Sequence, residues 1–304
     1  MTFATRSSLI LALIVAAALA GCNGSPQGGK SLTEQQQDAM KLPDPGQRAR
    51  KLCPIADKQH KAGDVLGARS TLASARDAAL TVKDPASRAG ALTYVAGFFA
   101  KLDQSADDLK SILRAAAKAA EEITDPDAKI RALSELAFAT GTQRKNAALA
   151  TSYLRTAEEA AGGIESVVSK VTALCRIAVA YHKLDRAEDF NRVIAASQEL
   201  ARAAEGPRQQ CDALAEIGAV LALAKRDDES KAVFDEAEQV VAAIPEPEGQ
   251  AYALLNLAEK LSAAGRKEPA TKLLQQASDL ADKVTDGSVR GQLVEELEAA
   301  KKSR

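Results

Sequence analysis

The clearest pattern along the chain is an apolar motif that returns every 40 or 41 residues. Each copy has a leucine, an aliphatic residue three positions later and a small residue, alanine or glycine, directly after that. The leucines are Leu52, Leu92, Leu133, Leu174, Leu214 and Leu254. Because positions three and four apart share a helical face, each copy predicts an amphipathic helix. A repeat period of roughly 20 to 50 residues is typical of solenoids, in which each unit buries its apolar face against its neighbours.

Capping and helix-breaking residues divide each of these six units into two helices. First helices are expected to start where an acceptor side chain precedes a first-turn proline, or at a looser version of that signal. These starts are Asp44-Pro45, Asp84-Pro85, Asp125-Pro126, Glu165, Gly206-Pro207 and Glu246-Pro247. Breaks between the two helices of a unit are predicted at Gly63-Asp64, Asp103-Gln104, Gly141, Asp185, Asp227-Asp228 and Gly265.

The predicted fold is therefore an all-α, α/α solenoid (superhelix) of about six helix-turn-helix repeats of 40–41 residues, plus a C-terminal capping helix from Asp286. This repeat domain is expected to cover residues 44–304. Few segments alternate apolar and polar residues as a half-buried strand would. The 40 basic and 41 acidic residues give a net charge of −1, which does not suggest a nucleic-acid partner. Aromatic residues make up 3% of the chain and tryptophan is absent, so base-stacking and sugar-stacking sites are not expected, and no small-molecule substrate is evident.

Within each unit the spacing resembles the tetratricopeptide repeat (TPR) pattern L-G-x2-Y followed by A-x3-F-x2-A. Unit five matches it with Ile217-Gly218, Leu221, Ser230, Phe234 and Ala237. The resemblance extends over residues 44–284. The units here are longer than the family's roughly 34 residues, and the family's early tryptophan is replaced by leucine. We therefore describe the repeats as TPR-like.

This resemblance implies that one face of each first helix lines a concave groove that binds a protein partner. The transferred groove residues are Arg50, Asp57, His60, Arg131, Phe138, Val179, His182, Asp212, Tyr252 and Glu259. The middle of the groove is expected to be narrow and apolar, with charge at both ends and no array of basic side chains for a peptide carboxylate. An extended or helical segment of a protein is the expected guest.

Two cysteine–histidine pairs, Cys53 with His60 and Cys175 with His182, are each seven residues apart and therefore share a helical face. A thiolate and an imidazole could share a metal, but the two pairs lie three repeats apart and cannot complete one tetrahedral zinc site. Nucleophilic catalysis would need an orienting group and an oxyanion site, and the sequence shows neither. We therefore interpret the four residues as packing residues and expect no metal, no cofactor and no enzymatic activity.

Two further patterns have alternative interpretations. Cys175 and Cys211 fall on adjacent first helices, where a disulfide is possible, although helix axes roughly 8–10 Å apart exceed the Cα separation of about 5.5 Å that a disulfide prefers. Basic residues recur four positions before the repeat leucine. They could form a ladder along one edge, or each could pair with an acid within its own helix, as Asp84 with Arg88 would at i, i+4. The recurring residues are Arg48, Arg88, Lys129 and Lys170.

The N-terminus looks like an export signal. The apolar run from Leu9 to Ala20 is twelve residues long, about 18 Å as a helix, and is too short to cross a bilayer core of roughly 30 Å. Residues 1–21 are therefore expected to be a signal peptide. Leu19-Ala20-Gly21-Cys22 resembles the lipobox of bacterial lipoproteins, which implies cleavage before Cys22 and lipidation of its thiol. In that family an aspartate after the cysteine retains the protein at the inner membrane. Asn23 at that position favours the outer membrane, facing the periplasm.

Residues 22–43 are expected to form a flexible tether by composition, with a polar segment around Gln35-Gln36-Gln37 that could be briefly helical. The leading hypothesis is a lipid-anchored scaffold of the cell envelope that docks another envelope protein in its groove. An alternative is a periplasmic chaperone or substrate-delivery factor that holds unfolded clients. An enzyme on an α/α scaffold is a third possibility, which the absence of tryptophan and of a clustered acid pair disfavours.

Overall fold

The computed structural model describes residues 30–102, 106–141 and 146–302, and these are all helix, turn or loop. The cysteine of the lipobox, Cys22, and the rest of the export signal lie outside the described residues, as does the break expected at Asp103-Gln104. The helices are α1 Leu32–Met40, α2 Pro45–Lys61, α3 Val65–Leu80, α4 Pro85–Lys101, α5 Ala106–Glu121, α6 Pro126–Gly141, α7 Ala147–Gly162, α8 Val167–Lys183, α9 Ala187–Arg202, α10 Pro207–Leu223, α11 Asp227–Val241, α12 Pro247–Ala263, α13 Lys267–Ala281 and α14 Gly287–Lys302.

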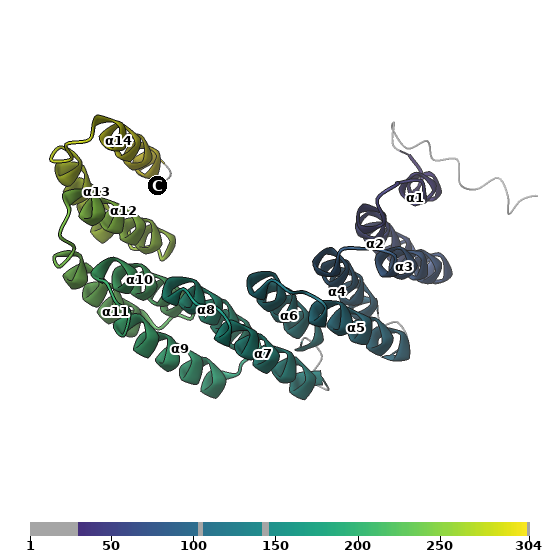
Figure 1. Ribbon diagram of the computed structural model, residues 1–304. Helices are drawn as coiled ribbons and strands as arrows, with labels where there is room; N and C mark the ends of the chain where they lie inside the picture. The colour runs from purple at the N-terminus through teal and green to yellow at the C-terminus, as the bar shows by residue number, and fades with distance from the viewer. Residues whose placement is uncertain (1–29, 103–105, 142–145, 303–304) are drawn as a thin grey trace, which may run out of the picture.

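The six predicted units are present as helix pairs, from α2/α3 (unit one) to α12/α13 (unit six), followed by α14. Figure 1 shows that the pairs form a curved arc in two layers. The first helices α2 to α12 and the capping helix α14 lie on the inner, concave side, and the second helices α3 to α13 lie on the outer side. Each first helix packs against the next first helix, and each second helix packs against the first helices of its own and the following unit. The predicted α/α solenoid is confirmed.

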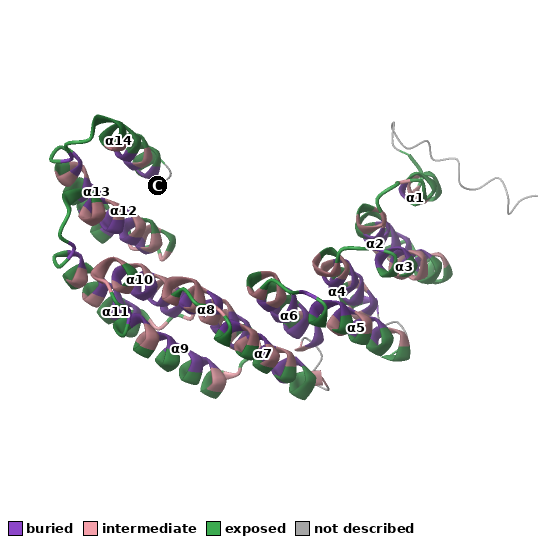
Figure 2. Ribbon diagram, in the orientation of Figure 1, coloured by how far each residue is buried: buried purple, intermediate pink, exposed green. Residues whose placement is uncertain are grey.

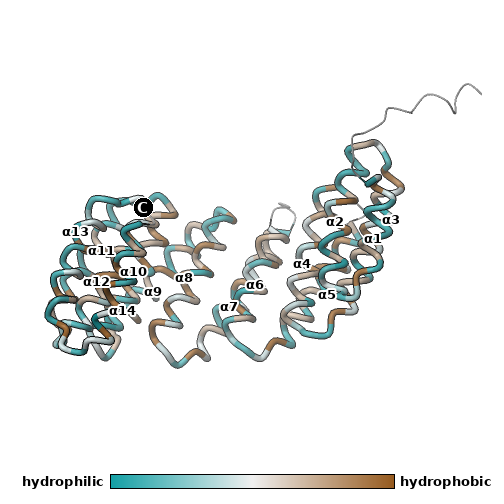
Figure 3. The backbone as a smooth tube through the Cα atoms, turned by 90° about the horizontal axis from the view of Figure 1, so that it is seen from above, coloured by the Kyte–Doolittle hydropathy of each residue, from teal (hydrophilic) through white to brown (hydrophobic). Residues whose placement is uncertain are grey.

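The repeating apolar motif forms the core between the two layers. All six aliphatic residues of the motif and all six small residues after them are buried. Five of the six repeat leucines are buried as well, while Leu174 is half-buried. Figure 2 shows the buried residues between the layers and the exposed ones on the outer helix faces, and Figure 3 shows hydrophilic residues along the exterior. Burying one such aliphatic side chain contributes about 1.5–3 kcal/mol, so the pattern that recurs in the sequence is also what holds adjacent helices together.

The small residue of the motif lets the two helices of a unit approach closely. In unit five a Cβ added to Gly218 would lie 2.9 Å from two ring carbons of Phe234 on α11. Ser230 on the same helix donates a hydrogen bond of 2.8 Å to the Gly218 carbonyl. In α14 the equivalent position is Glu298, which is exposed, and the repeat-leucine position is Val294, which is 43% exposed. A charged side chain at this position is suited to a helix that faces solvent, which explains the capping role of α14.

Most expected helix starts agree with the structure. Asp44 and Asp84 cap α2 and α4, accepting hydrogen bonds from the backbone N–H groups of Gln47 at 2.6 Å and Ser87 at 2.7 Å. These bonds satisfy N–H groups that have no partner within the helix. The start predicted at Glu165 is wrong by one residue, because the cap of α8 is the Ser166 hydroxyl.

Left-handed residues mark four of the turns within units. Gly63 (φ 86°) and Gly265 (φ 78°) lie where the breaks were predicted, and so does Asp185 (φ 55°). In unit five the break lies earlier than Asp227-Asp228. Lys225 has φ 60° and α11 already begins at Asp227. Acidic side chains in the first turn of a helix face its partial positive charge, so the acidic pair starts the helix and does not interrupt it.

In four of the six units, the residue four positions before the repeat leucine has a role that neither sequence interpretation anticipated. Its side chain donates to a backbone carbonyl six residues earlier, in the loop that leads into the first helix. The bonds are Arg48 to Leu42 (2.7 Å), Arg88 to Val82 (3.2 Å), Gln210 to Ala204 (3.2 Å) and Gln250 to Ile244 (2.7 Å). Because arginine and glutamine both supply N–H donors, the charge itself is not what recurs. The side chains at these four positions therefore fasten the loop between consecutive units.

The N-terminal boundary of the folded body differs from the expectation of a tether up to residue 43. Leu32–Met40 forms α1, with Ser31 and Glu34 in a reciprocal capping box. This helix packs against α2, buries Ala39 and is joined to α2 by a hydrogen bond from Gln59 to Gln36 (3.2 Å). The composition that suggests a tether is that of residues 23–29, which lie outside the described residues, and α1 contains the segment around Gln35-Gln36-Gln37 for which a brief helix is expected. Any flexible tether must therefore end before Leu32.

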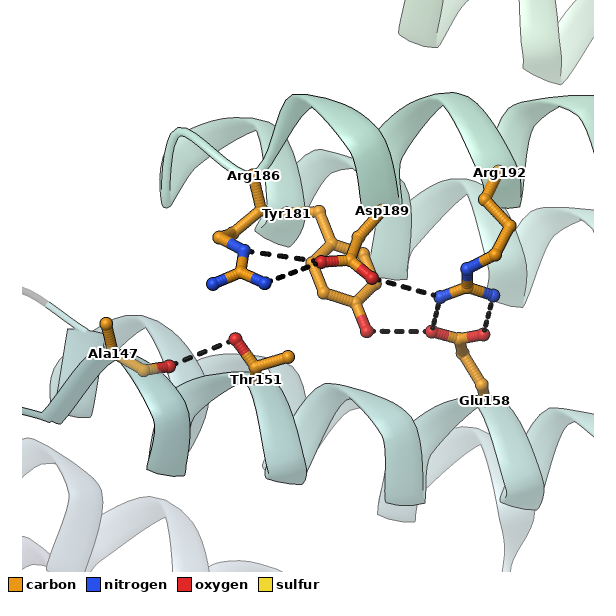
Figure 4. Close-up of polar contacts among 7 residues, drawn as sticks. All are labelled: Ala147, Thr151, Glu158, Tyr181, Arg186, Asp189 and Arg192. Carbon is orange, nitrogen blue, oxygen red and sulfur yellow. Dashed lines mark hydrogen bonds and ion pairs between the residues drawn. The ribbon is translucent and has the colours of Figure 1, made fainter.

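Ion pairs cross between neighbouring second helices on the outer side of the arc. Arg76 on α3 faces Asp108 on α5, and Arg202 on α9 pairs with Glu236 on α11 at 2.7 Å. Figure 4 shows a third such contact, in which Glu158 on α7 receives two hydrogen bonds from Arg192 on α9 (2.6 and 2.8 Å). Long side chains are suited to the outer layer, because curvature separates these helices more than the first helices.

The same carboxylate also reaches the core. The buried Tyr181 of α8 donates to Glu158 at 2.8 Å, and Asp189 joins Arg192 to Arg186. Burial, together with this donated hydrogen bond, raises the pKa of Tyr181. The network couples units three and four through three helices.

Candidate functional site

The inner face of the arc carries the ten residues transferred from the TPR resemblance. None of them is buried: Arg50, Arg131, Phe138 and Glu259 are exposed, and Asp57, His60, Val179, His182, Asp212 and Tyr252 are half-buried. They do not form one uniform groove. Two of them, Asp57 and Asp212, are paired within the chain, and the surroundings of the ten residues differ between the two ends and the middle of the arc.

At the N-terminal end, between α2 and α4, the charged groups neutralise one another. Asp57 accepts ion pairs from Lys101 at 2.8 Å and from Lys61 at 2.9 Å, and these lysines lower the pKa of its carboxyl. The ammonium group of Lys101 also lies 5.7 Å from the centroid of the Phe98 ring. Apart from the exposed Arg50, which forms no ion pair with the described residues, this part of the inner face leaves little uncompensated charge for a guest.

In the C-terminal units, polar side chains on the inner face also pair with one another. Asp212 on α10 accepts hydrogen bonds from Arg208 (3.1 Å) and from Asn256 on α12 (2.7 Å). Arg208 lies over the ring of Tyr252, with 5.9 Å between guanidinium carbon and centroid. One turn further along the same pair of helices, Lys260 pairs with Glu216. These contacts hold α10 and α12 together, and we interpret them as structural.

Between α6 and α8, in the middle of the arc, the inner face has a pocket of about 330 Å³. Aromatic and aliphatic groups, three basic side chains and one acidic side chain surround it. The lining residues are Arg131, Ser134, Glu135, Phe138, Arg176, Val179, Ala180 and Lys183. Two of the predicted groove residues from α6, Arg131 and Phe138, are thereby brought against Val179 from α8.

Two polar groups of this pocket lack a hydrogen-bond partner within the described part of the chain. The Ser134 hydroxyl is buried and unpaired, and so is the Nη1 atom of Arg176. Arg176 faces Asp127 at 3.8 Å, which is an ion-pair distance but too long for a hydrogen bond. Buried polar groups in folded proteins nearly always have partners, so unpaired ones that line a pocket indicate that a ligand or water completes them.

The charge of the pocket favours an anionic guest. Three of its lining side chains are basic and one, Glu135, is acidic; Asp127 faces Arg176 from outside the lining, and Lys183 lies 5.7 Å from the centroid of the exposed Phe138 ring. The expectation of an apolar middle without an array of basic side chains is therefore wrong. Arg131, Arg176 and Lys183 come from two different units, and their separation in the sequence hides the fact that α6 and α8 lie side by side. The sequence contained one signal for this basic pocket, namely an arginine on the inner face of each of two consecutive first helices.

The cysteine–histidine pairs do not form a site. Cys53, Cys175 and Cys211 are buried and free, and burial raises the pKa of Cys53 and Cys211 to about 12 and also raises that of Cys175. The half-buried His182 instead stacks near Phe190, with ring centroids 5.8 Å apart. No group of three potential metal ligands occurs among the residues that the structure describes. The Cys175–Cys211 disulfide that the sequence left open is absent here, since both thiols are free.

No helix in the described ranges is both long and apolar enough to span a bilayer. The tetratricopeptide repeat family matches residues 209–283, which contain most of α10 and all of α11 and α12 and end just after α13. No curated protein matches the chain.

Among solved structures, the crystal structure of Ton1535 from Thermococcus onnurineus NA1 is 15% identical, covers 94% of this chain and 97% of its own, and has a TM-score of 0.43. Nro1, described as a hypoxic regulator of sterol synthesis and a nuclear import adaptor, is 13% identical, covers 88% of this chain and 98% of its own, and has a TM-score of 0.30. At these low TM-scores neither structure contributes to the interpretation. The matched segment and the helix-pair architecture together describe a TPR-like repeat protein.

Proposed function

We propose that this protein is a lipid-anchored scaffold of the bacterial cell envelope that binds an acidic segment of another envelope protein in the pocket between α6 and α8. TPR-like repeats support a role in binding proteins. The lipobox at Cys22 and the preceding apolar run support attachment to a membrane, with Asn23 favouring the outer membrane and its periplasmic side. The observation that carries the proposal is that two buried polar atoms of the pocket, the Ser134 hydroxyl and Arg176 Nη1, lack a hydrogen-bond partner in the described chain.

The preferred guest has a carboxylate next to an apolar side chain. The carboxylate would accept hydrogen bonds from Arg176 and the Ser134 hydroxyl, which have buried polar atoms without a partner in the described chain, and from the exposed Arg131 beside them. The apolar side chain would contact the exposed face of Phe138 and the methyl groups of Val179. An arginine fork is suited to a carboxylate because it can donate two parallel hydrogen bonds.

Crosslinking from position 138 tests this proposal. A photoreactive residue in place of Phe138 should capture one partner in stoichiometric amount, and the crosslinked peptide should contain aspartate or glutamate. Arg176→Gln should weaken capture at least tenfold, because hydrogen bonds to charged groups contribute about 1.5–3 kcal/mol. Arg155→Gln removes an exposed arginine from the outer helix α7 and is the matched control.

Three outcomes would contradict the proposal. Capture of many unfolded clients would favour the chaperone or substrate-delivery alternative. Capture that is unchanged by Arg176→Gln would show that the basic groups do not bind the guest. A crosslink to a peptide without acidic residues would assign the pocket to a different ligand chemistry.

A further inference from the structure

The N-terminal end of the inner layer, where α1 packs on α2, has a second pocket whose chemistry differs from that of the α6–α8 pocket. Its volume is about 400 Å³. Its floor is apolar and three lysines lie at its rim; the single acidic side chain, Asp38, pairs with Lys30 at 2.5 Å and leaves Lys51 and Lys58 uncompensated. The lining residues are Lys30, Gln35, Asp38, Ala39, Leu42, Lys51, Pro54, Ile55 and Lys58. An apolar floor within a basic rim matches the interface of an anionic membrane, where phosphate groups lie directly above hydrocarbon.

The exposed side of α2 extends this basic rim. Lys51, Pro54, Lys58 and Lys61 project from one helical face, since each is three or four residues from the next. Lys61 pairs with Asp57, whereas Lys51 and Lys58 form no ion pair with the described residues. The uncompensated positive charge is therefore concentrated on the face that borders the pocket.

The position of this pocket along the chain is the second argument. Only seven residues lie between Cys22 and Lys30 at the pocket rim, so eight Cα–Cα steps connect the two. Fully extended, eight steps span at most about 30 Å. A lipid on Cys22 would therefore hold this end of the arc within about 30 Å of the membrane surface.

From these observations we infer that the α1–α2 face, formed by Lys30, Lys51, Pro54 and Lys58 around the pocket, docks on anionic phospholipid headgroups of the membrane that holds the anchor. This inference rests on the proposed lipid at Cys22. Docking would fix the N-terminal end of the arc at the membrane surface. It would leave the α6–α8 pocket, two units further along the chain, free to bind its partner.

Lysine labelling on vesicles tests the inference. The full lipidated chain is reconstituted in phosphatidylcholine vesicles with or without phosphatidylglycerol and treated with an amine-acylating reagent. Lys51 and Lys58 should react several times more slowly when phosphatidylglycerol is present, and high salt should restore their rates, because salt screens exposed charges. Lys110 and Lys118, exposed on the outer helix α5, should react equally in both kinds of vesicle.

A charge-neutralising pair of variants separates docking from anchoring. In Lys51→Gln/Lys58→Gln, Lys30 should lose its protection on anionic vesicles, and Lys110→Gln/Lys118→Gln should leave that protection unchanged.

If mass spectrometry finds no acyl group on Cys22, the anchor proposal fails. The face is then tested alone by co-sedimentation, in which the Lys51→Gln/Lys58→Gln chain should bind anionic vesicles about thirtyfold more weakly, at roughly fivefold per lysine.

Two results would overturn the inference. Equal labelling of Lys51 and Lys58 with and without phosphatidylglycerol would show that the face does not contact lipid. Protection that occurs in native envelopes but not in protein-free vesicles would assign the face to a protein partner.

Discussion

Replacing Gly218 with alanine adds one methyl group at the contact between the two helices of unit five. In the helix interior, alanine is favoured over glycine by about 1 kcal/mol, so on propensity alone the change would stabilise α10. The added carbon, however, would lie 2.9, 2.9 and 3.0 Å from three ring carbons of the buried Phe234. Overpacking of this kind typically costs about 1–3 kcal/mol. We expect the cost of this overlap to exceed the gain in helix propensity, so that the free energy of opening unit five falls by about 1 kcal/mol in the variant.

The neighbouring unit shows how the strain can be relieved. At the positions equivalent to Gly218 and Phe234, unit six has Ala258 and Leu274, both buried. Phe234→Leu alone should lose about 1 kcal/mol, because it leaves unfilled space beside Gly218. The double variant Gly218→Ala/Phe234→Leu reproduces the unit-six pair and should lie within about 0.5 kcal/mol of the wild type. The expected coupling between the two sites is therefore about 2 kcal/mol.

Amide hydrogen exchange in α10 and α11 is the suitable assay, because a solenoid opens locally and one global unfolding transition need not report on one unit. The opening free energies of the wild type, both single variants and the double variant complete the cycle. Exchange in α2 and α3 is the internal control and should not change. Additive effects of the two substitutions, or stabilisation by Gly218→Ala in the wild-type background, would refute the role assigned to this contact.

Two further predictions follow from groups with shifted pKa values. Because burial raises the pKa of their thiols, Cys53, Cys175 and Cys211 should not react with a thiol reagent at pH 8 in the folded protein. All three should react in denaturant. If only one of the three reacts in the denatured, unreduced chain, Cys175 and Cys211 form a disulfide. Lys101 and Lys61 lower the pKa of Asp57. The stability that the Asp57 carboxylate contributes to the α2–α4 contact should therefore be fully present above about pH 5 and be lost as the pH falls through the lowered pKa. Asp57→Asn should remove this acid dependence of hydrogen exchange in α2 and α4, and identical acid profiles for wild type and variant would contradict it.

The architecture could be predicted from the sequence because the information that specifies it is local and repeated. The apolar motif repeats in every unit, so the helix pairs, the buried face and the period were visible without any long-range contact. The Asp-Pro helix starts and the glycine turns were also predictable, because caps and left-handed turns depend on residues within a few positions of one another. The errors at Glu165 and at Asp227-Asp228 were shifts of one or two residues.

Polar pairing between helices was not predictable in the same way. Asp212 and Asn256 are 44 residues apart, and Glu158 and Arg192 are 34 apart. Whether such groups meet depends on how far each helix is rotated and shifted along its neighbour, and the hydrophobic period leaves this undetermined by several ångströms. A shift of that size decides between a hydrogen bond and no contact.

The α6–α8 pocket shows, within a single site, what the sequence can predict and what it cannot. The sequence by itself determined that Arg131 and Phe138 lie on the inner face of one first helix and Val179 on that of the next. Only the tertiary structure decided that Arg176 and Lys183 lie against them with the unpaired Ser134 hydroxyl between the helices. The same holds for α1, for which the sequence predicts at most a brief helix and the tertiary structure shows a nine-residue helix packed on α2. The physical reason is that repetition encodes the buried contacts many times over, whereas each polar contact between helices depends on one particular pair of side chains.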